Sequence, residues 1–121
     1  GDAVGEAEAN SMQAKLVVEG ANGPLTPTAD LILADKGVVI IPDVYANAGG
    51  VTCSYLEQCQ NFAHLTWDED EVNARVIDLM RAAFERFYAF AQESKLPNRL
   101  AASVLGVKTI ADAHRMRGLH P

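Results

Sequence analysis

Four consecutive β-branched residues at positions 38–41 (VVII) constrain the fold of this 121-residue chain more than any other stretch. Such a run is typical of a strand that is buried on both faces, as in a parallel sheet. Pro42 has no N–H group to donate to a neighbouring strand, so we expect the strand to end there. A polar segment and the pair Gly49-Gly50 follow, and then a second apolar pattern that favours a helix. This stretch therefore predicts a strand, a loop and the start of a helix.

A second strand and a connecting helix are predicted upstream of this run. Residues 14–19 (AKLVVE) favour a strand, and the turn after them contains two glycines and an asparagine. Thr26 is a good N-cap, Pro27 suits the first turn of a helix, and Gly37 suits its end. Residues 14–41 therefore predict a βαβ unit, whose two strands are parallel in nearly all cases.

Three further helices are expected after this unit, over the approximate ranges 48–61, 69–94 and 98–117. Thr66 and Glu69 match a capping box at the start of the long helix, and Asn98 is the expected N-cap of the last one. Apolar residues recur every three or four positions in the long helix, as in an amphipathic helix. The residues expected to face inward on the last helix are Leu100, Val104, Val107, Ile110 and Ala111.

Two strands are too few for a self-sufficient parallel sheet with both faces covered. We therefore expect an α/β fold in which a partial parallel sheet, the βαβ unit, is followed by three C-terminal helices. The chain is long enough for one domain with its own core but not for two. The shortage of strands indicates that this chain is half of a larger unit.

Charge and composition exclude several classes of protein. The net charge is −6, which leaves no electrostatic footprint for nucleic acid or for an anionic membrane. No apolar run approaches the length that crosses a bilayer. Residues 1–13 are acidic and rich in small residues, which is wrong for a signal peptide, and they show no apolar period. We expect them to form a flexible or partly helical lead-in.

The two cysteines indicate the redox compartment. Cys53 and Cys59 lie six positions apart on one predicted helix. That spacing corresponds to about 9 Å of helical rise, which is too far for a disulfide. We expect both to be free, core or semi-buried thiols in a reducing cytoplasm. No pair of histidines or cysteines has the spacing of metal ligands, so no metal site is predicted.

A series of short motifs identifies a resemblance to one enzyme family. The motifs are VVEGANGP at 17–24, IPD at 41–43, NAGGVT at 47–52, Ser54-Tyr55, Trp67 with Glu69, Glu71, Val72 and Asn73, and ADAHRMRG at 111–118. In this order they closely resemble the C-terminal part of glutamate dehydrogenase, in one register over residues 14–118. The wider amino-acid dehydrogenase family shares NAGGV, whereas the EGANGP turn and the VTxSY helix start favour glutamate over leucine or phenylalanine members.

The resemblance implies a fold and an activity. Residues 14–121 would be the C-terminal half of a Rossmann-like NAD(P)-binding domain, together with its closing helices. The family interconverts L-glutamate with 2-oxoglutarate and ammonia, and NAD or NADP carries the hydride. The positions that would contact the coenzyme are Gly20, Ala21, Asn22 and Asn47. The positions that would line the substrate pocket are Gly50, Val51 and Ser54, with Ser54 bound to the side-chain carboxylate of the substrate.

The sequence also departs from the family pattern. It contains no G-x-G-x-x-G phosphate fingerprint, and it lacks the residue about twenty positions further on that separates NAD from NADP. The catalytic lysine and aspartate of the family belong to its N-terminal domain, and Cys53 stands where a small aliphatic residue is usual. We therefore assign no catalytic residue to this chain, leave the coenzyme as NAD or NADP, and expect the isolated chain to be an inactive homo-oligomer.

From the residues alone, plainer interpretations stay open. Gly49-Gly50 suits an ordinary helix-start turn, Asn22 suits a turn, and Ser54 suits an exposed helix surface. Three functions from different classes follow. The chain is part of an amino-acid dehydrogenase, a non-catalytic module that binds a nucleotide or a dicarboxylate, or a fragment that only associates with other chains.

Overall fold

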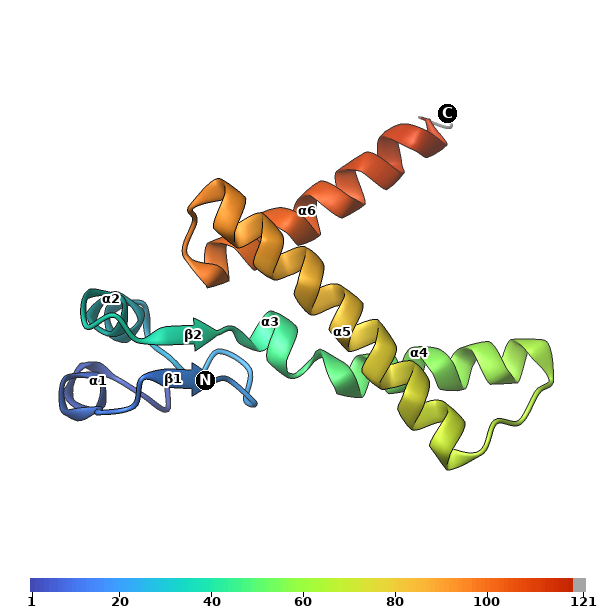
Figure 1. Cartoon of the computed structure of the whole chain (residues 1–121), viewed down its shortest axis with the longest axis horizontal. Coiled ribbons are helices and arrows are strands. Elements are labelled where there is room, and N and C mark those ends of the chain that lie inside the picture. The colour runs from blue at the N-terminus through green and yellow to red at the C-terminus, as the bar shows by residue number, and fades with distance from the viewer. Residues whose placement is uncertain (119–121) are drawn as a thin grey trace.

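The computed structural model describes residues 1–118, and the last three residues of the predicted domain, 119–121, lie outside the described residues. The elements are α1 (Glu6–Ser11), β1 (Leu16–Val18), α2 (Pro27–Asp35), β2 (Val39–Ile41), α3 (Asp43–Ala46), α4 (Ala48–Ala63), α5 (Glu69–Ser94) and α6 (Asn98–Arg117). In Figure 1, α1 and α2 lie to the left of the two strands, α3 and α4 lie beyond the carboxyl ends of the strands, and α5 runs from beside α4 back toward the strands. The chain therefore combines a two-stranded parallel sheet with a large helical part.

The predicted βαβ unit is confirmed in its order and in the direction of its strands. Leu16–Val18 pairs in parallel with Val39–Ile41, and α2 connects the two strands. The ends of α2 also follow the prediction. Thr26 Oγ1 accepts a hydrogen bond from the Ala29 N–H at 3.2 Å, and Gly37 follows the helix with a φ of +72°. A positive φ is the conformation for which glycine is favoured, so Gly37 ends this helix for a steric reason.

The apolar run of β2 is not buried on both faces, as the sequence predicted. Ile40 points into the core, whereas Val39 is 50% exposed and Val18 of β1 is 60% exposed. Leu16, Val18 and Val39 lie on one face of the sheet and are each at least half exposed, so no element within residues 1–118 fully covers that face. The prediction was wrong because burial depends on neighbours that this two-stranded sheet does not have.

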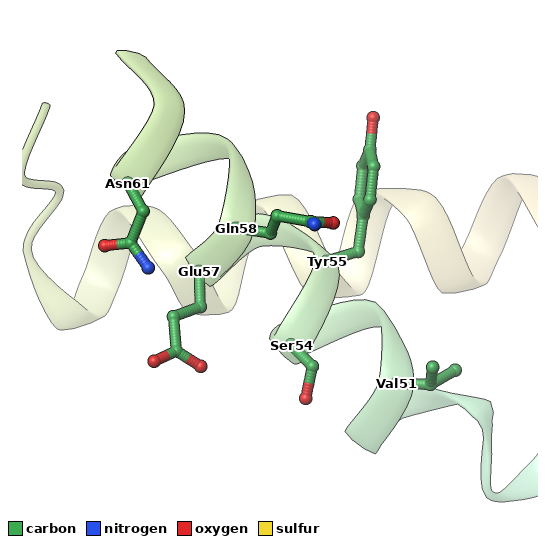
Figure 2. Close-up of a pocket in the computed structure, with 6 residues that line it drawn as sticks. All are labelled: Val51, Ser54, Tyr55, Glu57, Gln58 and Asn61. Carbon is green, nitrogen blue, oxygen red and sulfur yellow. The ribbon is translucent and has the colours of Figure 1, made fainter. Parts of the chain in front are cut away.

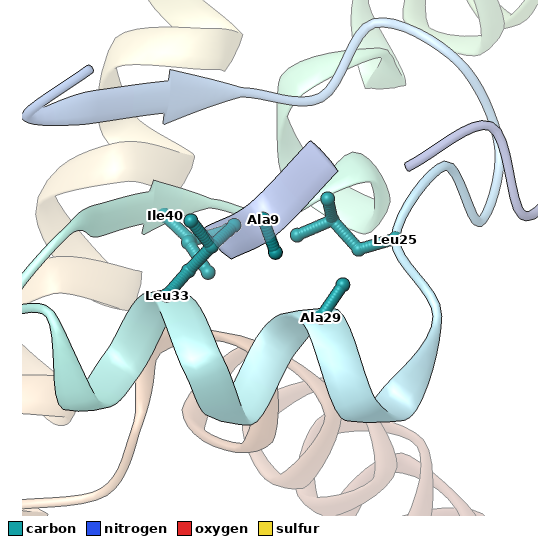
Figure 3. Close-up of a cluster of buried hydrophobic side chains, with 5 residues drawn as sticks. All are labelled: Ala9, Leu25, Ala29, Leu33 and Ile40. Carbon is teal, nitrogen blue, oxygen red and sulfur yellow. The ribbon is translucent and has the colours of Figure 1, made fainter. Parts of the chain in front are cut away.

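Two apolar clusters hold the chain together. In the first, side chains from α1, α2, β2 and the segment before α2 point toward one another (Figure 3), and its members are Ala9, Leu25, Ala29, Leu33 and Ile40. The second joins α5 to α6 through Phe87, Ala91 and Ala101. Removing most of a fully buried leucine such as Leu33 typically costs about 2–5 kcal/mol, so the first cluster makes a large contribution to the stability of the sheet end.

The lead-in, residues 1–13, contains helix α1 and contributes to the first cluster. Ala9 is fully buried against α2. Lys36 Nζ donates to the carbonyl oxygens of Ala9, Asn10 and Met12 at 3.0, 2.9 and 2.6 Å. Carbonyls at a helix C-terminus have no partner within the helix, so this lysine caps α1.

Both predicted N-caps of the later helices were wrong. Asp68 caps α5 in place of Thr66, because its Oδ1 accepts a hydrogen bond from the Glu71 N–H at 2.8 Å. Asn98 is the first residue of α6 and makes no cap. Its Nδ2 instead donates to the Ile40 carbonyl oxygen at 2.8 Å. A closer acidic residue and a tertiary acceptor thus override the local patterns.

Several predicted inward positions are exposed. Val107 and Ile110 of α6 are 69% and 73% exposed, and Ala101 is the buried residue of that helix. Cys53 is exposed and Cys59 is half-buried. The two thiols are free, as predicted, but the expected burial of Cys53 was wrong. No helix within residues 1–118 combines the length and the apolar character needed to traverse a bilayer.

Candidate functional site

The predicted coenzyme positions lie on two loops at the carboxyl ends of the strands. Residues 20–22 follow β1, and Asn47 lies between α3 and α4, after β2. Because the strands are parallel, both loops follow the carboxyl ends of the strands, which is where open α/β sheets bind ligands. Asn47 Nδ2 donates to Asn22 Oδ1 at 2.6 Å. The structure thus brings two of the predicted residues into direct contact, although their role toward a coenzyme stays a prediction.

Asp43 ties these two loops together. Its Oδ2 accepts a hydrogen bond from the Gly23 N–H at 2.7 Å, and its Oδ1 accepts one from the Val44 N–H at 2.8 Å. The bond from Gly23 is the main cause that lowers the pKa of the Asp43 carboxyl below its ordinary value of 3.8. Partial burial opposes this shift, and the Val44 N–H and the positive charge of Arg99 add to it. The carboxylate form is therefore the form that the fold stabilises.

This shift predicts how stability responds to acid. A lowered pKa contributes stability that is fully present above the unfolded pKa of about 3.8 and is lost as the pH falls through the folded pKa. Asp43→Asn is expected to be less stable than the wild type at pH 7 by on the order of 1 kcal/mol, because the amide oxygen still accepts a hydrogen bond but without the negative charge. Urea unfolding at pH 7 and below pH 3.8 measures both chains. A difference that stays constant into acid would contradict this account.

A partly buried ion cluster lies next to the two loops. The side chain of Glu19 is fully buried, and Arg99 binds it with two nitrogens, Nη2 to Oε1 at 2.6 Å and Nη1 to Oε2 at 3.0 Å. Arg99 also contacts Asp30 at 3.2 and 3.3 Å and Asp43 at 3.5 Å. The hydrogen bond to Glu19 raises the pKa of Arg99, burial opposes this, and Asp30 adds to it. We call Glu19, Asp30, Asp43 and Arg99 the Arg99 cluster.

Sequence reasoning missed this cluster. Arg99 lies 80 positions after Glu19, so no local pattern connects them. One signal was present, because Glu19 directly follows an apolar strand and precedes a tight turn. A carboxylate held there in the core needs a cation, since an unpaired buried charge is very costly. The sequence alone did not indicate which cation it would be.

The predicted substrate positions lie at the start of α4. Val51 and Ser54 line a hollow on the surface of this helix, and Gly50 is not among its lining residues. Figure 2 shows the side chains that line it, which are Val51, Ser54, Tyr55, Glu57, Gln58 and Asn61. All of them come from α4, so the hollow has one wall. The carboxylate of Glu57 lines it beside hydroxyl and amide groups, and no lysine or arginine does, so a dicarboxylate would need a cation from elsewhere.

The glycine pair of α4 has no structural requirement within the described residues. Neither Gly49 nor Gly50 has a positive φ. A Cβ atom built on either one would meet nothing within 4 Å. In addition, the side chain of the N-cap residue Asn47 accepts no hydrogen bond from the first N–H groups of α4. The role of Gly50 toward a substrate therefore stays a prediction.

Comparison with known proteins identifies the family. The model of the Glutamate/Leucine/Phenylalanine/Valine dehydrogenase family matches residues 1–118. The chain belongs to this family. The match includes residues 1–13, which the resemblance of the motifs left unplaced. Within residues 1–118, no group of three or more histidine, cysteine, aspartate or glutamate residues is arranged to hold a metal ion.

Relatives of this chain include glutamate dehydrogenases. It is 46% identical over 113 residues to the NAD-specific glutamate dehydrogenase of Staphylococcus aureus, which covers 93% of the chain and 27% of that protein. It is 40% identical to the glutamate dehydrogenase of Thermotoga maritima, covering 98% of the chain and 29% of that protein. The chain therefore spans less than a third of the length of these relatives.

Solved structures agree with this relationship. The glutamate dehydrogenase of Peptoniphilus asaccharolyticus superimposes with a TM-score of 0.91 at 36% identity, over 96% of the chain and 29% of that protein. The hetero-hexameric glutamate dehydrogenase of Thermus thermophilus gives a TM-score of 0.89 at 32% identity, over 95% and 28%. The strands and helices of this chain thus have the arrangement found in a segment of glutamate dehydrogenases.

Proposed function

We propose that this chain is the C-terminal part of a glutamate dehydrogenase and forms one wall of its active site. The complete enzyme would convert L-glutamate into 2-oxoglutarate and ammonia and pass a hydride to NAD. The hydrogen bond between Asn22 and Asn47 carries this proposal, because it joins the two loops at the carboxyl ends of the parallel strands, where such sheets bind ligands. The names of the relatives support the substrate, and the two free thiols support a cytoplasmic location.

The hydrogen bonding of the strands supports a larger, Rossmann-like sheet and indicates where it continues. The Val39 N–H donates to the Lys15 carbonyl, and the Glu19 N–H donates to the Ile41 carbonyl. Alternate residues of a strand direct their backbone groups to opposite sides, so the backbone of Ile40 faces the outer edge of β2.

The outer edge of β2 is occupied, whereas that of β1 is open. Asn98 Nδ2 already donates to the Ile40 carbonyl. The backbone groups of Leu16 and Val18 face away from β2 and have no strand beside them within residues 1–118. We infer that the remaining strands of the domain join at β1, which makes β2 the edge of the complete sheet.

The side-chain amides of Asn22 and Asn47 fit the uncharged end of the coenzyme. Asn47 Nδ2 is used by Asn22, which leaves Asn22 Nδ2 as a donor and Asn47 Oδ1 as an acceptor. These groups are complementary to a ribose hydroxyl and to the nicotinamide carboxamide. The backbone of Gly20 and Ala21, in the loop after β1, would lie beside the ribose. NAD is favoured over NADP because a close relative is NAD-specific.

Assay of the complete subunit that carries these residues tests the proposal. Purified enzyme with L-glutamate and NAD is expected to form NADH, followed by its absorbance, and to release an equal amount of ammonia. Turnover of leucine, phenylalanine or valine without turnover of glutamate would overturn the proposed substrate. Turnover with NADP alone would overturn the proposed coenzyme.

The role of Ser54 gives a second prediction. In the complete enzyme, Ser54→Ala removes one hydrogen bond to a charged carboxylate, which is worth about 1.5–3 kcal/mol. The KM for glutamate should therefore rise roughly 10- to 150-fold, since about 1.4 kcal/mol corresponds to a factor of ten. The KM for the coenzyme should change much less. Ser11→Ala, on the exposed surface of α1, is the matched control, and equal changes in both KM values would indicate a structural role for Ser54.

A further inference from the structure

We propose that Arg99 is a positioning residue that holds the two coenzyme-binding loops in register. This inference rests on the proposed function, because it assigns a role toward the coenzyme of that same site. Arg99 belongs to α6, whereas the loops follow β1 and β2, so three separate segments meet at one guanidinium. Asn22 and Asn47 bind each other, so any effect of Arg99 on them must be indirect.

The first step of the coupling is the carboxylate of Glu19. Arg99 holds both of its oxygens, at 2.6 and 3.0 Å. The Asp43 N–H donates to Glu19 Oε2 at 2.8 Å. Glu19 directly precedes Gly20, and Asp43 is the first residue of α3. One buried carboxylate therefore fixes the start of the first loop against the start of the second.

The second step leads from Asp43 to the asparagine pair. Asp43 Oδ2 holds the Gly23 N–H at 2.7 Å, and Gly23 is the residue after Asn22. The Asn47 N–H donates to the Asp43 carbonyl oxygen at 3.1 Å, so Asn47 lies one turn beyond Asp43. Both asparagines are thus within two hydrogen-bonded steps of the residue that Arg99 and Glu19 hold in place.

The chemistry of the Arg99 cluster requires arginine. Within the described residues, Arg99 is the one cation in salt-bridge contact with the carboxylates of Glu19, Asp30 and Asp43. Its planar fork can bind Glu19 with two parallel hydrogen bonds while Nε and Nη2 reach Asp30. A lysine would keep the charge but offers a single point of contact. Arg99→Lys therefore preserves charge and changes geometry.

The test is the coenzyme kinetics of the complete enzyme carrying Arg99→Lys. Misplacing a binding loop by about 1 Å can cost on the order of 100-fold, so we expect the KM for NAD to rise about 10- to 100-fold. The KM for glutamate should change less, because Ser54 lies on α4 and makes no contact with the Arg99 cluster. Glu19→Gln, which keeps the shape and removes the charge, should change the KM for NAD in the same direction. Arg115→Lys, at an exposed position of the same helix, is the matched control.

The outcomes separate positioning from mere stability. All kinetics are measured at a temperature where thermal melts show each variant to be folded. If Arg99→Lys or Glu19→Gln is folded and its KM for NAD stays within about twofold of the wild type, the inference is overturned. A twofold change is far smaller than the roughly 100-fold effect expected from a misplaced binding group. A lower melting temperature with unchanged KM values would assign the cluster a structural role. A wild-type enzyme without glutamate turnover would overturn the proposed function itself, independently of these variants.

Discussion

The isolated 121-residue chain is expected to give no turnover of glutamate with NAD or NADP above background. The hollow that contains Val51 and Ser54 has one wall, formed by α4 alone, and no cation lines it. The sequence holds no G-x-G-x-x-G loop for the coenzyme phosphates. By the family resemblance, the catalytic lysine and aspartate lie in another domain. Without these groups, neither the substrate nor the pyrophosphate is held in a reactive position.

The experiment compares the isolated chain with the complete enzyme. Both are purified from a host that lacks glutamate dehydrogenase and assayed by NADH absorbance. Loss of all measurable turnover is expected in the isolated chain, and turnover above background would contradict the proposed division of the active site. Thermal melts with NAD or 2-oxoglutarate address the alternative of a binding module, since a ligand at 100 times its Kd stabilises by about 2.7 kcal/mol. An upward shift of the melting temperature would support that alternative.

Most of the regular structure could be predicted because its signals are local. Proline after an apolar run ends β2, and Thr26 caps α2 through a neighbour three positions away. The direction of the strands followed from the short helical connection between them. Asp68 and Asn98 show the limit of such local rules. In each, the side chain found a partner that the pattern did not consider.

The positions proposed for the candidate site were named from the sequence, whereas the contacts between them were not. Asn22 and Asn47 were both named, but their hydrogen bond spans 25 positions and depends on the register of the two strands. Arg99 could not be identified as the partner cation of Glu19, since it lies 56 to 80 positions after the three carboxylates that it contacts. Ion pairs of that kind depend on how α6 crosses the sheet end, which the periodicity of a single helix does not determine.

Exposed apolar residues mark where the sequence predicted burial that this chain lacks. Val39, Val107 and Ile110 are each at least half exposed. Their pattern is that of core residues, whereas the structure of residues 1–118 leaves them without cover. The relatives are more than three times as long as this chain. The missing cover is the physical reason to expect that the chain alone does not remain a monomer.

We therefore expect the isolated chain to form a homo-oligomer. The outer edge of β1 presents backbone groups without a partner strand, and the apolar side chains of Leu16 and Val18 are exposed beside it. Open strand edges and exposed apolar patches both promote self-association. The edge of β2 is less available, because Asn98 binds its outer carbonyl. Pairing of β1 edges between two copies is the expected contact, and sedimentation velocity at several concentrations measures it.

A charge at this edge should weaken the association. Val18→Lys places a lysine beside the open edge, as natural edge strands do to prevent pairing. We expect the dissociation constant to rise about tenfold or more, which corresponds to about 1.4 kcal/mol. Val51→Lys makes the same change at an exposed position on α4 and is the matched control. An equal effect of both substitutions would show that association does not use the β1 edge. A wild-type chain that stays monomeric at high concentration, with one cooperative melt, would show that it closes its own core.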